Sequence, residues 1–144
     1  TFDFISFQDF LKIYPNEFTC LKYLEELKWK NGFTCKKCGN TKYAYIQKSV
    51  SRKCSKCAYI ESSTNSTIFQ GIKFPIVKAF YIVYLSAMDS NELTIEELSE
   101  ILELRKNTCW SFRKKVLEVK SNISNSSKIK DKNKFESIIL NVFE

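Results

Sequence analysis

Four cysteines fall into two Cys-x2-Cys pairs, and this spacing constrains the fold of the chain more than any other feature. The pairs are Cys35 with Cys38 and Cys54 with Cys57. Two such pairs predict a four-thiolate zinc site, because each supplies two ligands from one tight turn and together they complete a tetrahedron. A closed tetrahedron leaves no open position for a substrate, so the expected single Zn²⁺ is structural. The alternatives are two disulfide bonds or unpaired core thiols.

The residues around the two pairs predict a small sheet. Residues 42–50 alternate and are rich in Tyr, Ile and Val, which favours a strand, and residues 58–62 are a candidate return strand. Gly39 suits the turn after the first pair, since glycine tolerates a positive φ. A sheet of this size buries too little apolar surface to fold alone, so metal binding is expected to drive its folding.

Helical signals dominate on both sides of this sheet. Before it, Ser6 and Asn16 are candidate N-caps of two short helices. After it, residues 74–89 are apolar on nearly every side, as in a buried helix. Residues 93–120 predict a helix-turn-helix, in which the second helix carries an apolar stripe. The stripe consists of Cys109, Phe112, Val116 and Val119.

These signals predict an α+β fold that is mostly helical, with N-terminal helices, a zinc ribbon and a helix-turn-helix bundle. The expected divisions are residues 1–32 for helices packing on the ribbon, 33–73 for the ribbon, 74–120 for the helical domain and 121–144 for a polar linker with a short apolar tail. No run approaches the roughly 18 apolar residues of a membrane span. Cys20 is expected to be a small core residue.

Positive charge is concentrated in two stretches of the chain, whose net charge is +7. Residues 35–73 hold eight Lys or Arg and one acidic residue, and residues 105–120 hold six and one. The segment between them, residues 74–104, holds one basic and six acidic residues. Clustered basic charge is typical of a polyanion binder, the alternative being a solvated surface that aids solubility. Double-stranded DNA is therefore the expected partner.

The candidate DNA contacts lie in these two basic stretches. In the last helix, Lys106 and Asn107 suit base edges in a major groove, and Arg113 and Lys114 suit backbone or guanine contacts. Lysines on the ribbon suit phosphate contacts. Tyr43 and Tyr45 share a strand face and are expected to pack on a helix, with base stacking as the alternative. Trp110 is expected in helix packing, with a groove contact as the alternative. The candidate contacts are Lys106, Asn107, Ser111, Arg113 and Lys114 in the helix, and Lys42, Lys48, Arg52, Lys53 and Lys56 on the ribbon.

The order of these elements and several motifs resemble the transposase zinc-ribbon family, the N-terminal region of a group of bacterial insertion-sequence transposases. The resemblance covers roughly residues 7–120. It implies a DNA-recognition region that, in the family, precedes an RNase H-like catalytic domain using acidic residues and divalent metal. The matching stretches are FTCLKYLEELKW (18–29), GFTCKKCG (32–39), RKCSKC (52–57), STIFQGIKFP (66–75), Tyr84-Leu85 and Thr108-x-Trp110.

The chain departs from the family pattern at the interhelical turn. Glu103 stands where the family usually has glycine, and Arg105 where it usually has a Ser or Thr helix cap. Either the turn is unconventional, or Asn107 caps a helix that begins later. The acids after residue 117 match no acidic triad, and the chain has no histidine, the commonest general base. We therefore expect no enzymatic activity from this chain.

Three functions compete at this point. The leading hypothesis is a double-stranded DNA-binding protein with structural zinc, related to a transposase DNA-recognition region. The second is an adaptor subunit of a nucleic-acid machine, whose ribbon binds a protein partner and whose apolar tail, Phe135–Phe143, anchors it. The third is a truncated transposase. The expected location is the cytoplasm, in association with the nucleoid, without membrane binding.

Overall fold

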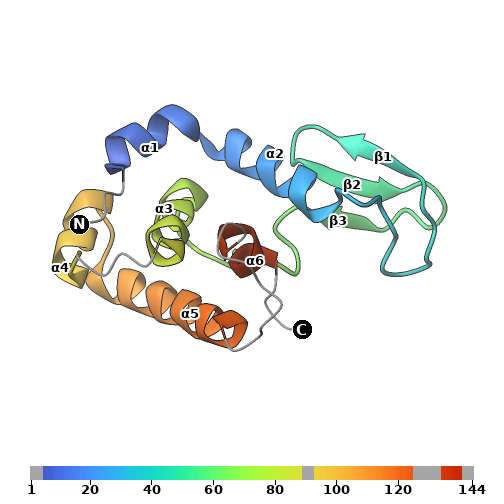
Figure 1. Cartoon of the computed structure of the whole chain (residues 1–144). Helices are drawn as coiled ribbons and strands as arrows, with labels where there is room; N and C mark the ends of the chain where they lie inside the picture. Colours follow the sequence, from blue (N-terminus) through green and yellow to red (C-terminus); the bar gives the residue numbers. More distant parts are fainter. Residues whose placement is uncertain (1–4, 89–92, 125–133, 141–144) are drawn as a thin grey trace.

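The computed structural model describes residues 5–88, 93–124 and 134–140, which form six helices and one three-stranded sheet. Figure 1 shows the helices gathered in one body and the sheet projecting from one end of it, with α2 leading from the body toward the sheet. The predicted α+β class, mostly helical, is confirmed. No helix in the described ranges is long and apolar enough to cross a membrane.

Two helices open the chain at the positions where caps were predicted. Helix α1 spans Phe7–Ile13 and α2 spans Glu17–Lys28. The side chains of Ser6 and Asn16 each accept a hydrogen bond from the backbone amide three residues later, at 3.1 and 2.9 Å. Such caps satisfy amides that have no partner inside the helix. Both helices contact α3, so much of this segment packs on the helical body, and α2 reaches the ribbon from Lys22 onward.

The sheet is antiparallel, in the order β1-β2-β3. Strand β1 spans Tyr43–Ile46, β2 spans Ser51–Cys54 and β3 spans Ile60–Ser62. The first strand is shorter than residues 42–50, because the chain turns after Ile46 and Val50 takes a positive φ of 49°. The return strand starts two residues later than predicted, because Ala58 also takes a positive φ, of 67°.

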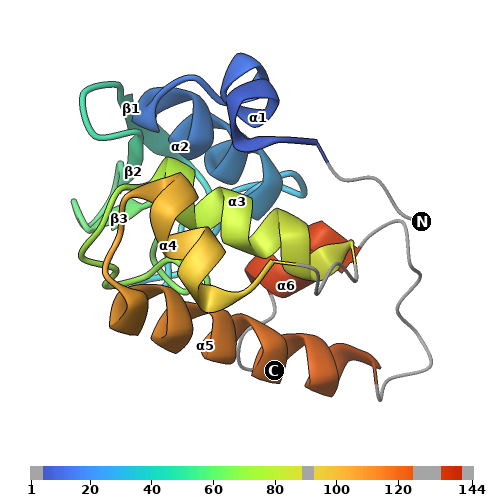
Figure 2. The same cartoon turned by 90° about the vertical axis from the view of Figure 1, so that its left-hand side faces the viewer.

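Helix α3, Ile76–Ala87, lies at the centre of the helical body. Nine of its residues are buried, which confirms the prediction of a helix that is apolar on nearly every side. Figure 2 shows α3 between α1 and α2 on one side and α5 on the other. The Phe80 ring stacks on Phe69 at 4.8 Å, so the segment before α3, assigned by sequence to the ribbon, belongs to the helical core.

Helix α4, Ile95–Leu102, and helix α5, Lys106–Ser124, follow α3. The capping box predicted at Thr94 and Glu97 is present. Between the helices Glu103 adopts the left-handed conformation, with φ 55° and ψ 47°, which glycine would adopt with less strain. Because α5 already begins at Lys106, the alternative in which Asn107 caps a later helix is wrong, and the turn is the unconventional one. The predicted stripe of α5 is buried.

The C-terminal segment differs from its prediction as a polar linker with a separate tail. Helix α5 continues through residues 121–124, and residues 125–133 lie outside the described residues. Helix α6, Lys134–Leu140, then packs on α3 and α5, and both Ile138 and Ile139 are fully buried. The Ile139 carbonyl also accepts a hydrogen bond from the Ile68 amide at 3.1 Å. The described part of the tail therefore packs on the chain's own core and does not present these two side chains to a partner.

Candidate metal centre and nucleic-acid interface

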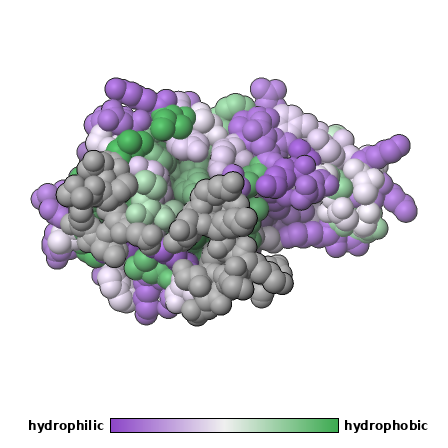
Figure 3. Space-filling model, viewed as in Figure 1, coloured by the Kyte–Doolittle hydropathy of each residue, from purple (hydrophilic) through white to green (hydrophobic). Residues whose placement is uncertain are grey.

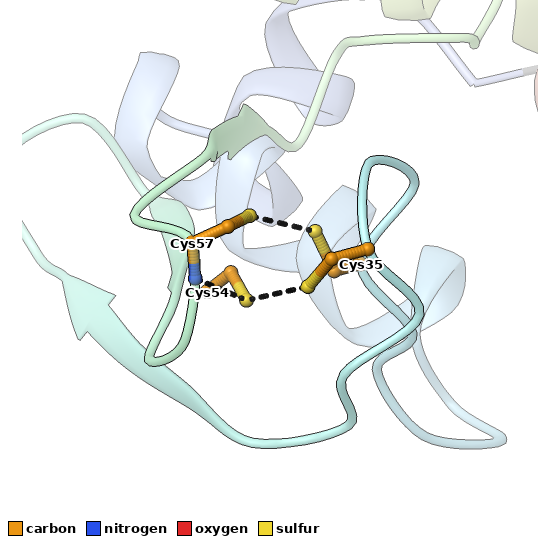
Figure 4. Close-up of side chains that lie close together, drawn as sticks. Cys35, Cys54 and Cys57 are labelled. Carbon is orange, nitrogen blue, oxygen red and sulfur yellow. Dashed lines mark hydrogen bonds between the residues drawn. The ribbon is translucent and has the colours of Figure 1, made fainter.

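The four predicted cysteine ligands converge at the end of the sheet. Their sulfur atoms all lie within 4.8 Å of one another. Cys35 Sγ is 3.6 Å from Cys57 Sγ, and Cys38 Sγ is 3.5 Å from Cys54 Sγ (Figure 4). A tetrahedral zinc with Zn–S bonds of about 2.3 Å would hold its sulfurs about 3.8 Å apart. The arrangement therefore fits one four-thiolate zinc ion.

The two Cys-x2-Cys turns have the same backbone construction. In each, the first cysteine carbonyl accepts from the amide four residues later: Cys35 from Gly39 at 2.9 Å, and Cys54 from Ala58 at 3.0 Å. In each, the first cysteine amide donates to the carbonyl five residues later, at 2.8 Å. Gly39 and Ala58 occupy equivalent positions, with φ of +82° and +67°. The sequence predicted this requirement at Gly39 and missed it at Ala58, where no glycine marks it.

Backbone amides point at the sulfurs of both turns. The Lys37 amide donates to Cys35 Sγ at 3.3 Å, and the amides of Lys56 and Cys57 donate to Cys54 Sγ at 3.3 and 3.4 Å. The amides of Cys57 and Lys56, the Cys57 amide first, help to lower the pKa of Cys54 to about 6. Amide donors favour the thiolate, which is the form that binds zinc. The donor set therefore suits the metal that the spacing predicted.

The disulfide alternative for the four clustered cysteines is not supported. The sulfur separations at the site are well beyond the roughly 2.05 Å of a disulfide bond, and all six cysteines are free thiols. The remaining two, Cys20 and Cys109, are fully buried in the helical core, as predicted. Burial raises the pKa of Cys20 to about 12, which keeps it a neutral thiol.

The comparison with known families agrees with this geometry. Residues 15–60 match the family described as the transposase zinc-ribbon domain. The match includes α2, both cysteine turns and the sheet as far as the start of β3, which confirms the resemblance seen in the sequence. No curated protein and no solved structure matches the chain significantly.

A buried ion pair joins α2 to the sheet of the zinc-ribbon domain. Arg52 Nε lies 3.0 Å from Glu25 Oε2, and both side chains are largely buried. The guanidinium carbon of Arg52 is 4.1 Å from the centre of the Tyr43 ring and 4.7 Å from that of Trp29. Arg52, which was predicted to contact a phosphate, is thus largely buried between α2 and β2. The sequence offered no signal for the pairing, because its partners are 27 residues apart.

A second buried ion pair lies beside the first. Lys28 Nζ is 2.6 Å from Glu61 Oε2, and Lys36 Nζ is 3.4 Å from the same oxygen. Burial lowers the pKa of Lys28, and the Glu61 carboxylate opposes this shift. Glu61 is the one acidic residue among residues 35–73. Its isolation among basic residues could have indicated an ion pair from the sequence alone. Together the pairs fix the angle between α2 and the ribbon.

The other basic residues predicted on the zinc-ribbon domain are exposed. Figure 3 shows hydrophilic surface over the sheet end of the molecule. Tyr43 and Tyr45 are 41% and 40% exposed, with Tyr43 against Phe33 and Tyr45 4.9 Å from Lys22 Nζ of α2. Tyr45 therefore packs partly on α2, whereas Tyr43 packs on Phe33 and Arg52. The exposed basic residues are Lys42, Lys48, Lys53 and Lys56.

Most of the residues predicted on the last helix form one exposed face of α5. Trp110 belongs to this face and is 52% exposed, so the expectation that it packs in the interior was wrong. At about 100° per residue, Trp110 lies about 140° from the centre of the buried stripe, which explains its exposure. Lys114 Nζ lies 5.0 Å from the centre of its ring. The other exposed members are Lys106, Asn107 and Ser111.

Of the residues predicted on α5, Arg113 is the one that does not belong to this exposed face. It is half-buried, and its guanidinium donates to the Leu93 carbonyl at 2.9 Å. This bond ties α5 to the residues just before α4. Arg113 therefore supports the position of the face and lies beside it.

A groove of about 400 Å³ borders the exposed face of α5. It lies between the segment before α3 and the first half of α5, and Asn107 and Ser111 form part of its wall. Lys73, which is exposed, stands on the opposite wall. Sequence reasoning counted Lys73 in the basic stretch but did not select it. The structure brings it next to the face of α5.

Proposed function

We propose that the chain is a double-stranded DNA-binding protein related to a transposase DNA-recognition region, in which α4 and α5 act as a helix-turn-helix. The observation that carries the proposal is the face of α5. One side of this helix is buried by its apolar stripe, and the other presents lysine, asparagine and serine side chains to solvent. A helix presented in this way, with polar and basic residues in its first turns, suits a major groove.

The charge around that face supports DNA over a neutral or acidic partner. Residues 105–117 contain five Lys or Arg and no acidic residue. Lys73, across the groove from Asn107, extends the basic surface beyond the helix. Each lysine that neutralises a phosphate releases counterions, so such a surface binds DNA with strong salt dependence.

The zinc-ribbon domain supplies a second basic surface. Its exposed lysines suit contact with the phosphate backbone, where they would position the protein without reading sequence. Zinc would be held by Cys35, Cys38, Cys54 and Cys57, and it would keep the sheet and its lysines in place. The ion pairs on α2 then connect this surface to the helical body.

Binding, with no catalytic step, is the activity we assign to this chain. Four thiolates would fill the coordination sphere of the metal, and the sequence has no histidine to serve as a general base. The thiolates need a reducing environment, so we place the protein in the cytoplasm with the nucleoid. The adaptor hypothesis loses support from the described part of its proposed anchor, because Ile138 and Ile139 are buried in the chain's own core, and residues 141–143 lie outside the described residues.

The test is selection of binding sites from a pool of random duplex DNA by the zinc-loaded protein, repeated across a salt series. We expect enrichment of a defined motif and an affinity that falls steeply with salt. A folded, zinc-loaded protein that binds weakly and without preference would contradict the proposal. Capture of one protein partner under those same conditions would favour the adaptor alternative.

A further inference from the structure

Trp110 is the more exposed of the chain's two tryptophans, and such exposure is unusual for this residue type. It is 52% exposed, whereas Trp29 is 8% exposed and packs between α2 and the ribbon. Tryptophan is enriched where proteins contact other molecules, because it combines a large apolar area with a polar edge, so an open tryptophan on this helix suits such a contact. Trp110 lies on the solvent side of α5 and does not belong to the hydrophobic core.

The neighbours of Trp110 favour a nucleic acid over a protein. Asn107 and Lys114, one turn away on either side, are both exposed, and the Lys114 cation lies 5.0 Å from the ring centre. Protein interfaces surround an aromatic anchor with further apolar contacts and are depleted of lysine. The next exposed apolar residue of α5, Leu117, is two turns away. The ring therefore stands among groups that bind phosphates and base edges.

We propose that Trp110 is a specificity-determining residue that contacts the 5-methyl groups of thymines in the major groove. The proposal rests on the DNA-binding function proposed above. The thymine methyl is the apolar group that base pairs present in the major groove, and apolar side chains recognise it by van der Waals contact. The indole supplies a broad apolar surface for this contact, and Lys114 beside it supplies a cation for the adjoining phosphate.

The test removes the methyl groups and the ring separately. In the duplex motif selected by the wild-type protein, each thymine is replaced in turn by uracil, which lacks only the methyl group. Wild-type protein is expected to lose affinity at one or two positions, by about four-fold for each buried methyl. Trp110→Ala is expected to bind the original motif more weakly and to show no further loss at those positions. Leu117→Ala, which removes an exposed apolar side chain from the same helix, is expected to keep the full uracil effect.

The outcomes separate this inference from the function on which it rests. Specific binding in which uracil weakens wild type and Trp110→Ala equally, or weakens neither, overturns the role of Trp110 and leaves the proposed function standing. Loss of self-association with unchanged DNA affinity in Trp110→Ala also overturns it. A wild-type protein that selects no duplex motif overturns both. Because Trp110 is exposed, the variant should fold, and Trp110→Phe, which keeps a smaller ring, should retain part of the uracil effect.

Discussion

Arg52 and Glu61 face each other across β2 and β3, and each pairs with an opposite charge on the same helix. Arg52 binds Glu25, and Glu61 binds Lys28, one turn further along α2. The two strands and the helix thus carry a square of four alternating charges, at Arg52, Glu25, Lys28 and Glu61. Because the carboxylates are 5% and 1% exposed, each depends on its cation. A buried charge that loses its partner is costly, so this square holds α2 against the ribbon.

Removing Arg52 is expected to destabilise the protein by about 3 kcal/mol, because Arg52→Met leaves the Glu25 carboxylate buried beside only Lys22. The measurement is urea unfolding of the zinc-loaded protein, followed by circular dichroism. The double variant Glu25→Leu with Arg52→Met should be more stable than Arg52→Met, since no unpaired charge remains.

Lys12→Met provides the matched control for Arg52→Met. It breaks an ion pair with Asp9 whose side chains are 80% and 57% exposed, and should change stability by no more than about 0.5 kcal/mol. If Lys12→Met and Arg52→Met lower the free energy of unfolding equally, the buried pair contributes no more to stability than the exposed one.

Ala58 is expected to be a strained position that glycine relieves. It occupies the position of Gly39 in the equivalent turn, with φ of +67°, and its side chain is exposed. Strain therefore comes from the backbone alone, and Ala58→Gly should stabilise the zinc-loaded protein by about 1 kcal/mol. The measurement is the midpoint of thermal unfolding.

Ala44→Gly is the control for Ala58→Gly, because Ala44 is also exposed but lies inside strand β1. There glycine should destabilise by about 0.5–1 kcal/mol. A lower unfolding midpoint for both variants would refute the assignment of strain to Ala58.

The sequence predicted those features whose cause is local. Ser6, Asn16 and Thr94 were recognised as caps because a cap needs only a side chain and an amide three residues away. The cysteine ligands were recognised because a Cys-x2-Cys turn carries its own geometry. Even the exposure of Trp110 could have been found, since its angle from the buried stripe follows from helix periodicity.

The features that the sequence did not predict depend on packing between distant segments. Ile139 is buried because it meets Ile68, which no local pattern in the last ten residues could indicate. Arg52 counted as one more surface cation until the structure placed Glu25 beside it. Charge counting identifies a basic segment but does not separate the cations used inside the fold from those left for a partner.

Loss of zinc is expected to unfold the ribbon and spare the helical body. The ribbon core contains few buried residues, among them Trp29, Phe33 and two of the cysteines, whereas the helical core is far larger. Without metal so small a core cannot fold on its own. Cys38→Ser should bind no zinc by elemental analysis, lose the dispersed amide signals of the sheet in NMR spectra, and keep most of its helical circular dichroism.

Cys20→Ala is the control for the thiol itself, because Cys20 lies in the helical core, apart from the cluster. It should retain one zinc ion per chain. Zinc bound at full stoichiometry by Cys38→Ser would contradict the four-thiolate site, and complete loss of helix would show that the helical body depends on the metal.

The exposed face of α5 makes two separable predictions about DNA. Lys114→Gln removes the charge proposed for a phosphate contact and should weaken all duplexes alike, lowering the slope of log affinity against log salt by about 1. Asn107→Ala removes a base-edge contact and should relax the preference at one base pair, at a cost of about 1–3 kcal/mol for the selected motif. Lys12→Gln, which removes an equal charge from exposed α1, is the control and should leave both quantities unchanged. If Lys12→Gln lowers the salt slope as much as Lys114→Gln, the affinity comes from net charge and α5 does not form the binding face.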